Sequence, residues 1–175
     1  MVKEDEGLRR LNSLAANDAT TEFLKCCGSK EWARRMATER PFASFDELLD
    51  SASQIWWSLR PPDWLEAFDS HPKIGEKKAA SAVASDAQQW SEDEQSAVRN
   101  TGKHTMLRLA ELNRMYEEKF GYIFIVCASG KSSEEMMAIL RERLGNSPDQ
   151  ELQLAAAEQA KITRLRLGKL LVSSQ

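Results

Sequence analysis

The 175-residue sequence has few of the side chains that build metal centres, disulfides or membrane spans. It contains two histidines and three cysteines, Cys26, Cys27 and Cys127, with no CxxC spacing. This supply argues against a zinc site, a histidine-rich metal centre and a disulfide framework. No apolar run approaches the roughly 20 residues that span a bilayer, and the N-terminus lacks the apolar core of a signal peptide. We expect a metal-free protein with reduced thiols in a reducing compartment.

Several catalytic motifs are also missing. The sequence has no glycine-rich phosphate loop, no G-x-S-x-G, no HExxH and no aspartate pair at metal-site spacing. These absences weigh against nucleotide hydrolysis, serine hydrolysis and zinc chemistry. The net charge of −3 argues against a generic nucleic-acid binder. The small basic cluster of Lys73, Lys77 and Lys78 is typical of a solvated face.

The composition is that of a globular domain with a real core. The chain is 42% hydrophobic and 29% charged, and it carries five Trp and six Phe. Its apolar residues recur at helical spacing almost throughout. We therefore predict an all-α fold of about seven or eight helices. We expect one compact domain over residues 1–175, with flexible ends at 1–7 and 173–175.

Capping residues divide the first half of the chain. Ser29 is predicted to cap a helix that begins at Lys30. Ser44 and Glu47 have the spacing of a capping box. Asp63, after two prolines, is predicted to cap the segment DWLEAF.

The second half contains a further set of helix signals. Ser91 and Glu94 have capping-box spacing and predict the start of a long helix that runs toward Phe120. Ser132 or Ser133 is predicted to cap EEMMAILRERL, and a last helix is predicted over 149–172. Residues 122–127 are rich in β-branched side chains but have no partner strand. We expect them to form buried extended or helical chain.

Two histidines are candidates for acid–base chemistry. His71 lies in the break Ser70–Gly75 between two helical patterns, where functional side chains often occur. Its ordinary pKa suits proton transfer near neutrality, although a surface loop histidine would read the same way. His104 lies within a helical pattern and is expected to be a solvated residue.

Two polar groups are further candidates. Ser91, Glu94 and Gln95 suit either a helix cap or a catalytic carboxylate with neighbouring polar contacts. Arg164 and Arg166 are two residues apart in the last helix and therefore face different ways. One of them could bind a carboxylate or a ureido oxygen, and otherwise both complement the helix dipole.

The ordered combination of HPxIG, SxxEQ, KFGYxF and LRL resembles the 2-oxo-4-hydroxy-4-carboxy-5-ureidoimidazoline (OHCU) decarboxylase family. The four motifs begin at His71, Ser91, Lys119 and Leu165. The resemblance covers nearly the whole chain. It also includes Leu11-Asn12, Cys27-Gly28-Ser29, Trp32, Arg40-Pro41-Phe42, 63–68, Leu112-Asn113, Tyr116, Gly130, Arg143, Asn146, Glu158 and Ile162.

The resemblance implies a fold, an activity and a set of site residues. The family is all-α and converts OHCU, an intermediate of uric acid breakdown, to (S)-allantoin and carbon dioxide without a cofactor. It implies His71 and Glu94 as the catalytic residues. Arg166, with Arg164 as the fallback, is implied as the substrate-binding arginine. The other implied substrate contacts are Pro72, Ser91, Gln95 and the segment Phe124, Ile125, Val126, Cys127 and Ala128.

The resemblance also bears on partners and location. Family members are often homodimers, and some are fused to the hydroxyisourate hydrolase that makes OHCU. Leucines of the last helix exceed what one face needs, which suits a dimer. The terminal Ser173-Ser174-Gln175 is not a peroxisomal tripeptide, so we expect a cytoplasmic protein. Nucleic acid and membrane partners are not expected. Two alternatives stay open: a non-catalytic helical interaction module, and another cofactor-free lyase or isomerase acting on a small ureido ring.

Overall fold

A computed structural model describes residues 2–74, 85–94 and 102–172 of the chain. In these ranges the chain forms nine α-helices and no β-strand, which confirms the all-α prediction and adds one helix to the expected number. No helix in the described ranges has both the length and the apolar character needed to cross a bilayer.

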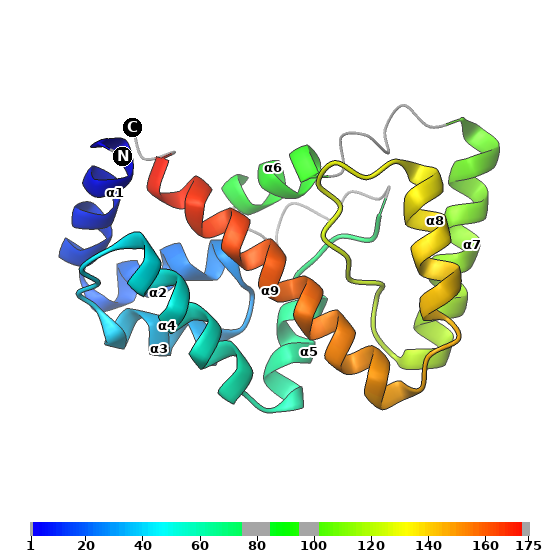
Figure 1. Ribbon diagram of the computed structural model, residues 1–175, viewed down its shortest axis with the longest axis horizontal. Helices are drawn as coiled ribbons and strands as arrows, with labels where there is room; N and C mark the ends of the chain where they lie inside the picture. Colours follow the sequence, from blue (N-terminus) through cyan, green and yellow to red (C-terminus); the bar gives the residue numbers. More distant parts are fainter. Residues whose placement is uncertain (1, 75–84, 95–101, 173–175) are drawn as a thin grey trace. The chain divides into compact units, whose positions relative to one another are not determined.

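The helices belong to two compact units. The first unit contains residues 1–67 and 160–175, and the second contains residues 68–159. Figure 1 labels the helices of the first unit: α1 (Val2–Ser13), α2 (Ala16–Cys26), α3 (Lys30–Glu39), α4 (Phe45–Ser58) and most of α5 (Pro61–Asp69). The second unit contains α6 (Ser85–Glu94), α7 (Lys103–Phe120) and α8 (Ser133–Arg143). The last helix, α9 (Pro148–Val172), contributes residues to both units.

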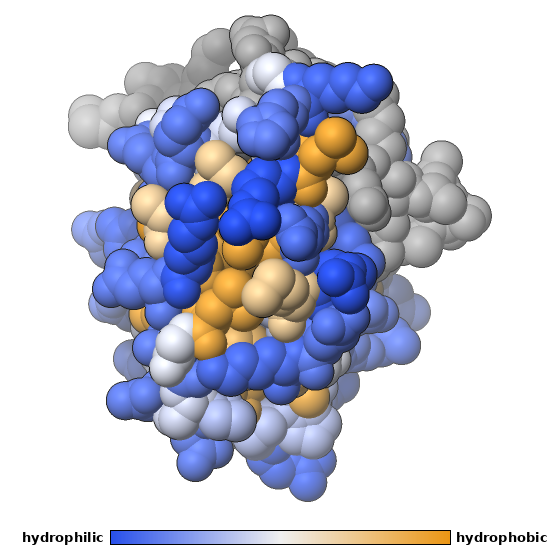
Figure 2. Space-filling view, turned by 90° about the vertical axis from the view of Figure 1, so that its right-hand side faces the viewer, coloured by the Kyte–Doolittle hydropathy of each residue, from blue (hydrophilic) through white to orange (hydrophobic). Residues whose placement is uncertain are grey.

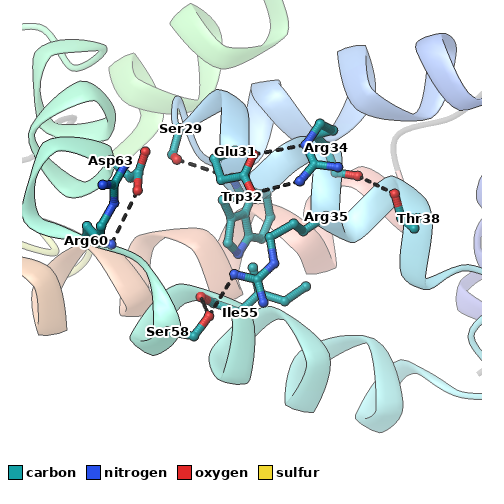
Figure 3. Close-up of polar contacts among 10 residues, drawn as sticks. All are labelled: Ser29, Glu31, Trp32, Arg34, Arg35, Thr38, Ile55, Ser58, Arg60 and Asp63. Atoms are coloured by element: carbon teal, nitrogen blue, oxygen red, sulfur yellow. Dashed lines mark hydrogen bonds and ion pairs between the residues drawn. The ribbon is translucent and has the colours of Figure 1, made fainter.

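Side-chain caps start α3 and α4 where the sequence predicts them. The Ser29 hydroxyl accepts a hydrogen bond of 3.3 Å from the Trp32 N–H at the start of α3 (Figure 3). The Ser44 hydroxyl accepts one of 3.1 Å from the Glu47 N–H at the start of α4. The Glu47 carboxylate turns back to the N–H of Ala43, one residue before the position that a capping box uses.

The core of the first unit is built around aromatic side chains. The rings of Trp32 and Phe42 both contact Phe23 edge-on, at centroid distances of 5.9 and 6.4 Å. The indole N–H of Trp32 donates to the carbonyl oxygen of Ala52 on α4 at 3.1 Å, so this buried polar atom is paired. On the outer side of α3, the guanidinium of Arg34 pairs with Glu31 (Figure 3).

Two predicted helix starts are wrong. α5 begins at Pro61 rather than at Asp63, because proline suits the first helical position, and Asp63 accepts from the Arg60 N–H at 3.3 Å (Figure 3). Ser91 does not begin a helix either. It lies inside α6, and its hydroxyl donates to the carbonyl oxygen of Ala87 at 3.0 Å, a bond that a mid-helix serine commonly makes.

The second unit packs α7 against α8, which lie side by side in Figure 1. Both helices end or begin as their sequences dictate. Gly121 adopts a left-handed φ of 82° and closes α7, and the Ser132–Glu135 capping box opens α8. The core of this unit consists of Ile74, Leu109, Leu112, Tyr116, Phe124, Val126, Ala128, Met136 and Leu140.

The outer face of α7 and α8 carries apolar side chains among charged ones (Figure 2). Leu107 and Met115 of α7 are 63% and 44% exposed. The surrounding charged side chains pair along the helix, as Arg114 does with Glu118. Isolated exposed apolar residues of this kind are common on soluble proteins.

The β-branched run forms buried extended chain. Residues 122–128 have neither helical nor ladder hydrogen bonding, and Phe124 to Ala128 are all buried. The prediction of a buried segment without a strand partner is therefore confirmed. Because buried backbone polar groups need partners, this segment must obtain them from elsewhere in the unit.

Candidate active site

His71 lies just after α5, in the break that the sequence indicates. Its N–H donates to the carbonyl oxygen of Phe68 at 3.2 Å, which holds the backbone at the end of the helix. Its ring is half-buried, and the Nε2 atom lies 2.6 Å from Oε1 of Gln159 on α9. Pro72 follows, also half-buried, and directs the chain away from helical geometry.

Side chains supply the partners of three backbone atoms in the buried segment 124–128. The Arg143 guanidinium donates to the carbonyl oxygen of Ile125 at 2.6 Å. The N–H of Cys127 donates to the Glu158 carboxylate at 2.7 Å, and the Lys131 ammonium donates to the Cys127 carbonyl at 2.7 Å. Charged partners make strong hydrogen bonds in a water-poor setting, so the segment is held in one conformation.

The arginine that holds Ile125 belongs to a buried network. Arg143 and Glu151 are 3% and 0% exposed and form an ion pair. The same carboxylate accepts from the Tyr116 hydroxyl at 2.5 Å and from the Asn146 amide at 2.9 Å. Burial, followed by the hydrogen bond to Glu151, raises the pKa of Tyr116, so its hydroxyl remains protonated as a donor.

Glu94 lies at the end of α6 and is half-buried, and Ser91, one turn earlier, is buried. The negative charge of Glu94 acts on the Cys127 thiol. Burial raises the pKa of that thiol most, and the carboxylates of Glu158 and Glu94 raise it further, against the opposing effects of the Ser129 backbone and Lys131. Gln95 lies outside the described residues.

The two candidate arginines belong to the first unit and differ in burial. Arg166 is 4% exposed, and its positive charge lowers the pKa of the neighbouring thiols of Cys26 and Cys27, although burial raises both more strongly. Arg164 is exposed. It borders a cavity of about 210 Å³ between α4 and α9 whose lining includes Trp56 and Leu167. Opposite burial follows from their spacing of two residues.

The other histidine is in a different setting. His104 lies in the first turn of α7 and is exposed, as the sequence predicts. Among the described residues, no three His, Cys, Asp or Glu side chains gather as a metal ion would require. The cysteines Cys26, Cys27 and Cys127 are buried, free thiols.

The sequence analysis missed Gln159, and it missed the roles of Arg143, Glu151 and Glu158. Three of the four lie on the buried side of α9, together with Ala155. The spacing of seven residues between Glu151 and Glu158 places them on one helix face. The sequence offered one signal for these residues: they are polar at positions where the helical period predicts apolar side chains.

Comparison with known proteins decides the family. Residues 12–168 match the OHCU decarboxylase family. The chain belongs to the OHCU decarboxylase family. It is 43% identical over 150 residues, or 85% of the chain, to the uric acid degradation bifunctional protein TTL of Arabidopsis thaliana. It is 30% identical, over 94% of each chain, to the OHCU decarboxylase of Amia calva.

Solved structures agree with the family membership. A crystal structure of an OHCU decarboxylase in the presence of (S)-allantoin superposes with a TM-score of 0.74. That protein is 41% identical in sequence, and the match covers 87% of this chain and 98% of that one. The chain spans 46% of the length of the Arabidopsis relative and 32% of a bifunctional relative from Bacillus.

Proposed function

We propose that this chain decarboxylates OHCU to (S)-allantoin without a cofactor. The observation that carries the proposal is the family match over residues 12–168, in which the HP motif coincides with a half-buried histidine held by Gln159. A histidine side chain can both donate and accept a proton, as this reaction requires.

The substrate supplies its own electron sink. The carboxylated carbon of OHCU is bonded to the carbon of a ring C=N bond. When the carboxylate leaves as carbon dioxide, the electron pair of the broken C–C bond flows toward that imine and gives an enol. Ketonisation, with a proton added at the ureido-bearing carbon, then gives allantoin. The protein has to orient the carboxylate, stabilise charge and deliver the proton to one face.

We assign the proton transfers to His71 and Glu94. Both would act on the hydroxyl and the departing carboxylate, and His71 would donate or relay the proton that sets the product's configuration. General acid–base groups of this kind contribute roughly 10²–10⁴-fold each. The half-burial of both residues supports the assignment, because partial exclusion of water suppresses the unaided decay of OHCU to racemic product.

The remaining contacts would hold the substrate. The backbone of residues 124–128 is fixed by Arg143, Glu158 and Lys131, as a surface that binds a ring must be. Arg166 is preferred to Arg164 because it is buried, and a buried guanidinium binds ureido or ring oxygens more strongly than a solvated one. The other proposed contacts are Pro72, Ser91 and Gln95.

One experiment tests the activity and the role of His71 together. Urate oxidase and hydroxyisourate hydrolase generate OHCU in a cuvette, and circular dichroism follows allantoin after this protein is added. We expect a fast signal of one sign from the wild type. With the variants His71→Asn and Glu94→Gln, the reaction should fall back to slow racemic decay. The control His104→Asn, at an exposed position of α7, should keep wild-type activity.

The outcomes separate the alternatives. A folded wild type that is indistinguishable from the enzyme-free reaction would favour the non-catalytic interaction module. Full activity in folded His71→Asn would remove the catalytic assignment while leaving the decarboxylase. A reaction with another small ureido ring but not with OHCU would favour a different cofactor-free lyase or isomerase.

We also propose a homodimer, a functional link to hydroxyisourate hydrolase and a cytoplasmic location. Leu165 and Val172 of α9 are 43% and 49% exposed, whereas Leu167, Leu170 and Leu171 are buried. The last three are therefore used within the fold, and the exposed pair would serve the dimer. Light scattering on the wild type and on a Leu165→Glu variant measures whether the mass is that of two chains and depends on this face.

A further inference from the structure

One buried amide faces the proposed catalytic histidine. Gln159 is fully buried, and its Oε1 atom lies 2.6 Å from Nε2 of His71. A carbonyl oxygen only accepts hydrogen bonds, so this contact is a hydrogen bond only in the tautomer that carries the proton on Nε2. In the neutral ring, Nδ1 is then the atom with the lone pair. The contact therefore selects one tautomer as well as one ring orientation.

The neighbouring residue on α9 has the opposite character. Glu158 carries a charge, and its carboxylate accepts from the Cys127 N–H at 2.7 Å. The carboxylate of Glu158 therefore binds the segment 124–128, whereas the neutral amide of Gln159 contacts the ring of His71. A carboxylate at position 159 would favour the charged imidazolium, because an opposite charge at this distance stabilises the protonated form. An amide keeps the hydrogen bond without that bias.

We propose that Gln159 is a positioning residue for His71: it sets the orientation of the ring and keeps the proton of the neutral ring on Nε2, which leaves Nδ1 to take up and pass on the proton of the reaction. The inference rests on the proposed function, in which His71 moves a proton. It assigns to a neutral amide the orienting role that a carboxylate has in many catalytic triads. The difference suits a histidine that must give up a proton rather than stabilise a lasting positive charge.

Charged groups also stand on the segments next to His71. On its own segment, Lys73 pairs with Glu117 of α7 at 2.9 Å. Asp69, two residues before His71, ends α5, and Glu158 of α9 binds the Cys127 N–H. A charge placed at position 159 would therefore act on His71 at hydrogen-bond distance, closer than a charge exchanged on the outer side of α9.

The direct test is nitrogen NMR of ¹⁵N-histidine-labelled protein. The chain has two histidines, and exposed His104 serves as an internal reference. We expect wild-type His71 to show the Nε2–H tautomer when neutral. Gln159→Met, similar in size but without the amide, should give a tautomer mixture. Gln159→Glu should raise the measured pKa of His71 by roughly one to two units.

The matched control is Gln153→Glu, which adds the same charge to the same helix at an exposed position. It should leave the titration of His71 nearly unchanged. If Gln159→Glu folds and shifts His71 no more than Gln153→Glu does, the proposal is wrong. An unchanged tautomer in folded Gln159→Met would overturn it as well.

The kinetic readout is the pH profile of allantoin formation. In Gln159→Glu, the limb governed by His71 should move to higher pH by the shift that NMR measures. Gln159→Met should lose roughly 10²-fold or more in kcat with a smaller change in KM, as loss of an orienting group does. Gln159→Glu, which keeps the hydrogen bond, should recover part of that loss. A pH limb that stays in place despite an NMR shift would overturn the inference.

The two hypotheses can fail separately. The NMR titration requires only folded protein, so it tests Gln159 even if the chain has no activity toward OHCU. An inactive wild type in which Gln159 still sets the tautomer would refute the decarboxylase proposal and retain the contact. An active wild type whose His71 tautomer and titration do not respond to substitutions at position 159 would refute only the inference.

Discussion

Arg143 donates a hydrogen bond of 2.6 Å to the backbone carbonyl oxygen of Ile125, in the middle of a buried segment that has no strand partner. The guanidinium is itself held by the fully buried carboxylate of Glu151. It also lies over the ring of Phe124, with its central carbon 4.7 Å from the ring centroid. One side chain thus joins α8, α9 and the proposed substrate-binding segment.

Replacing this arginine should destabilise the fold severely. Arg143→Met keeps the apolar stem but leaves the Glu151 carboxylate buried without its cation, and removal of one partner of a buried pair costs roughly 3–5 kcal/mol. Urea unfolding followed by far-UV circular dichroism measures the loss. The control is Arg114→Met, since Arg114 pairs with Glu118 in the open, where such pairs contribute about 1 kcal/mol or less. Equal losses in the two variants would contradict the role of the buried pair.

The capping box of α8 predicts a stability change at acidic pH. The Ser132 hydroxyl accepts from the Glu135 N–H at 3.2 Å, and Ser132→Ala should cost about 1 kcal/mol. The hydrogen bonds from Ser132, that of its N–H first, lower the pKa of Glu135 below its ordinary value of 4.5. A carboxylate with a lowered pKa in the fold stabilises the protein above its unfolded pKa. That contribution disappears as the pH falls through the folded value.

Urea midpoints measured between pH 6 and about pH 3 test this sign. Glu135→Gln should make the fall in stability at acidic pH shallower than in the wild type. Glu134→Gln, at the neighbouring exposed position, should not. A Glu135→Gln variant with an unchanged acid dependence would contradict the capping carboxylate.

The raised pKa of the Cys27 thiol predicts a loss of stability at alkaline pH. Burial raises the pKa of its thiol from 9.0 to about 11. The unfolded chain releases this proton first, so unfolding becomes easier as the pH rises from 9 toward 11. One such proton contributes at most about 1.4 kcal/mol per pH unit.

Stability curves at several pH values above 8 measure the slope, since the unfolded-state thiol begins to ionise there. In Cys27→Ala, the fall of stability with pH should become less steep by up to the contribution of one proton, about 1.4 kcal/mol per pH unit. The substitution should lower stability only modestly at neutral pH, because a small buried side chain is shortened. An equally steep curve in Cys27→Ala would contradict a pKa of Cys27 that is higher in the fold than in the unfolded chain.

The helix boundaries were predictable wherever a local cap decides them. Ser29, Ser44 and Ser132 each accept a hydrogen bond from the N–H three residues later, as their sequence spacing indicates. The same logic failed at Ser91, because a serine within a helix can bind the carbonyl four residues earlier instead. The spacing of Ser91 and Glu94 is the same whether the serine caps a helix or lies inside one. Which hydrogen bond the serine makes depends on where the helix begins.

The site was only partly predictable for a different reason. The family motifs single out His71 and Glu94, and they stay predictions until activity is measured. The contact between His71 and Gln159 joins residues 88 positions apart, and no local pattern encodes it. Packing within the second unit brings α9 to the loop after α5. A glutamine in a helical pattern gives no sign of which distant ring it will meet.

The bonds that fix the buried segment fall on main-chain atoms: the oxygen of Ile125 and both the nitrogen and the oxygen of Cys127. An alanine scan would therefore pass over this stretch, because every alanine keeps the same amide. Replacing the N–H of Cys127 with an ester oxygen by chemical ligation removes the hydrogen bond to Glu158 and leaves every side chain in place. Side-chain substitutions at Val126 and Cys127 should therefore leave these hydrogen bonds in place, because the bonds use backbone atoms.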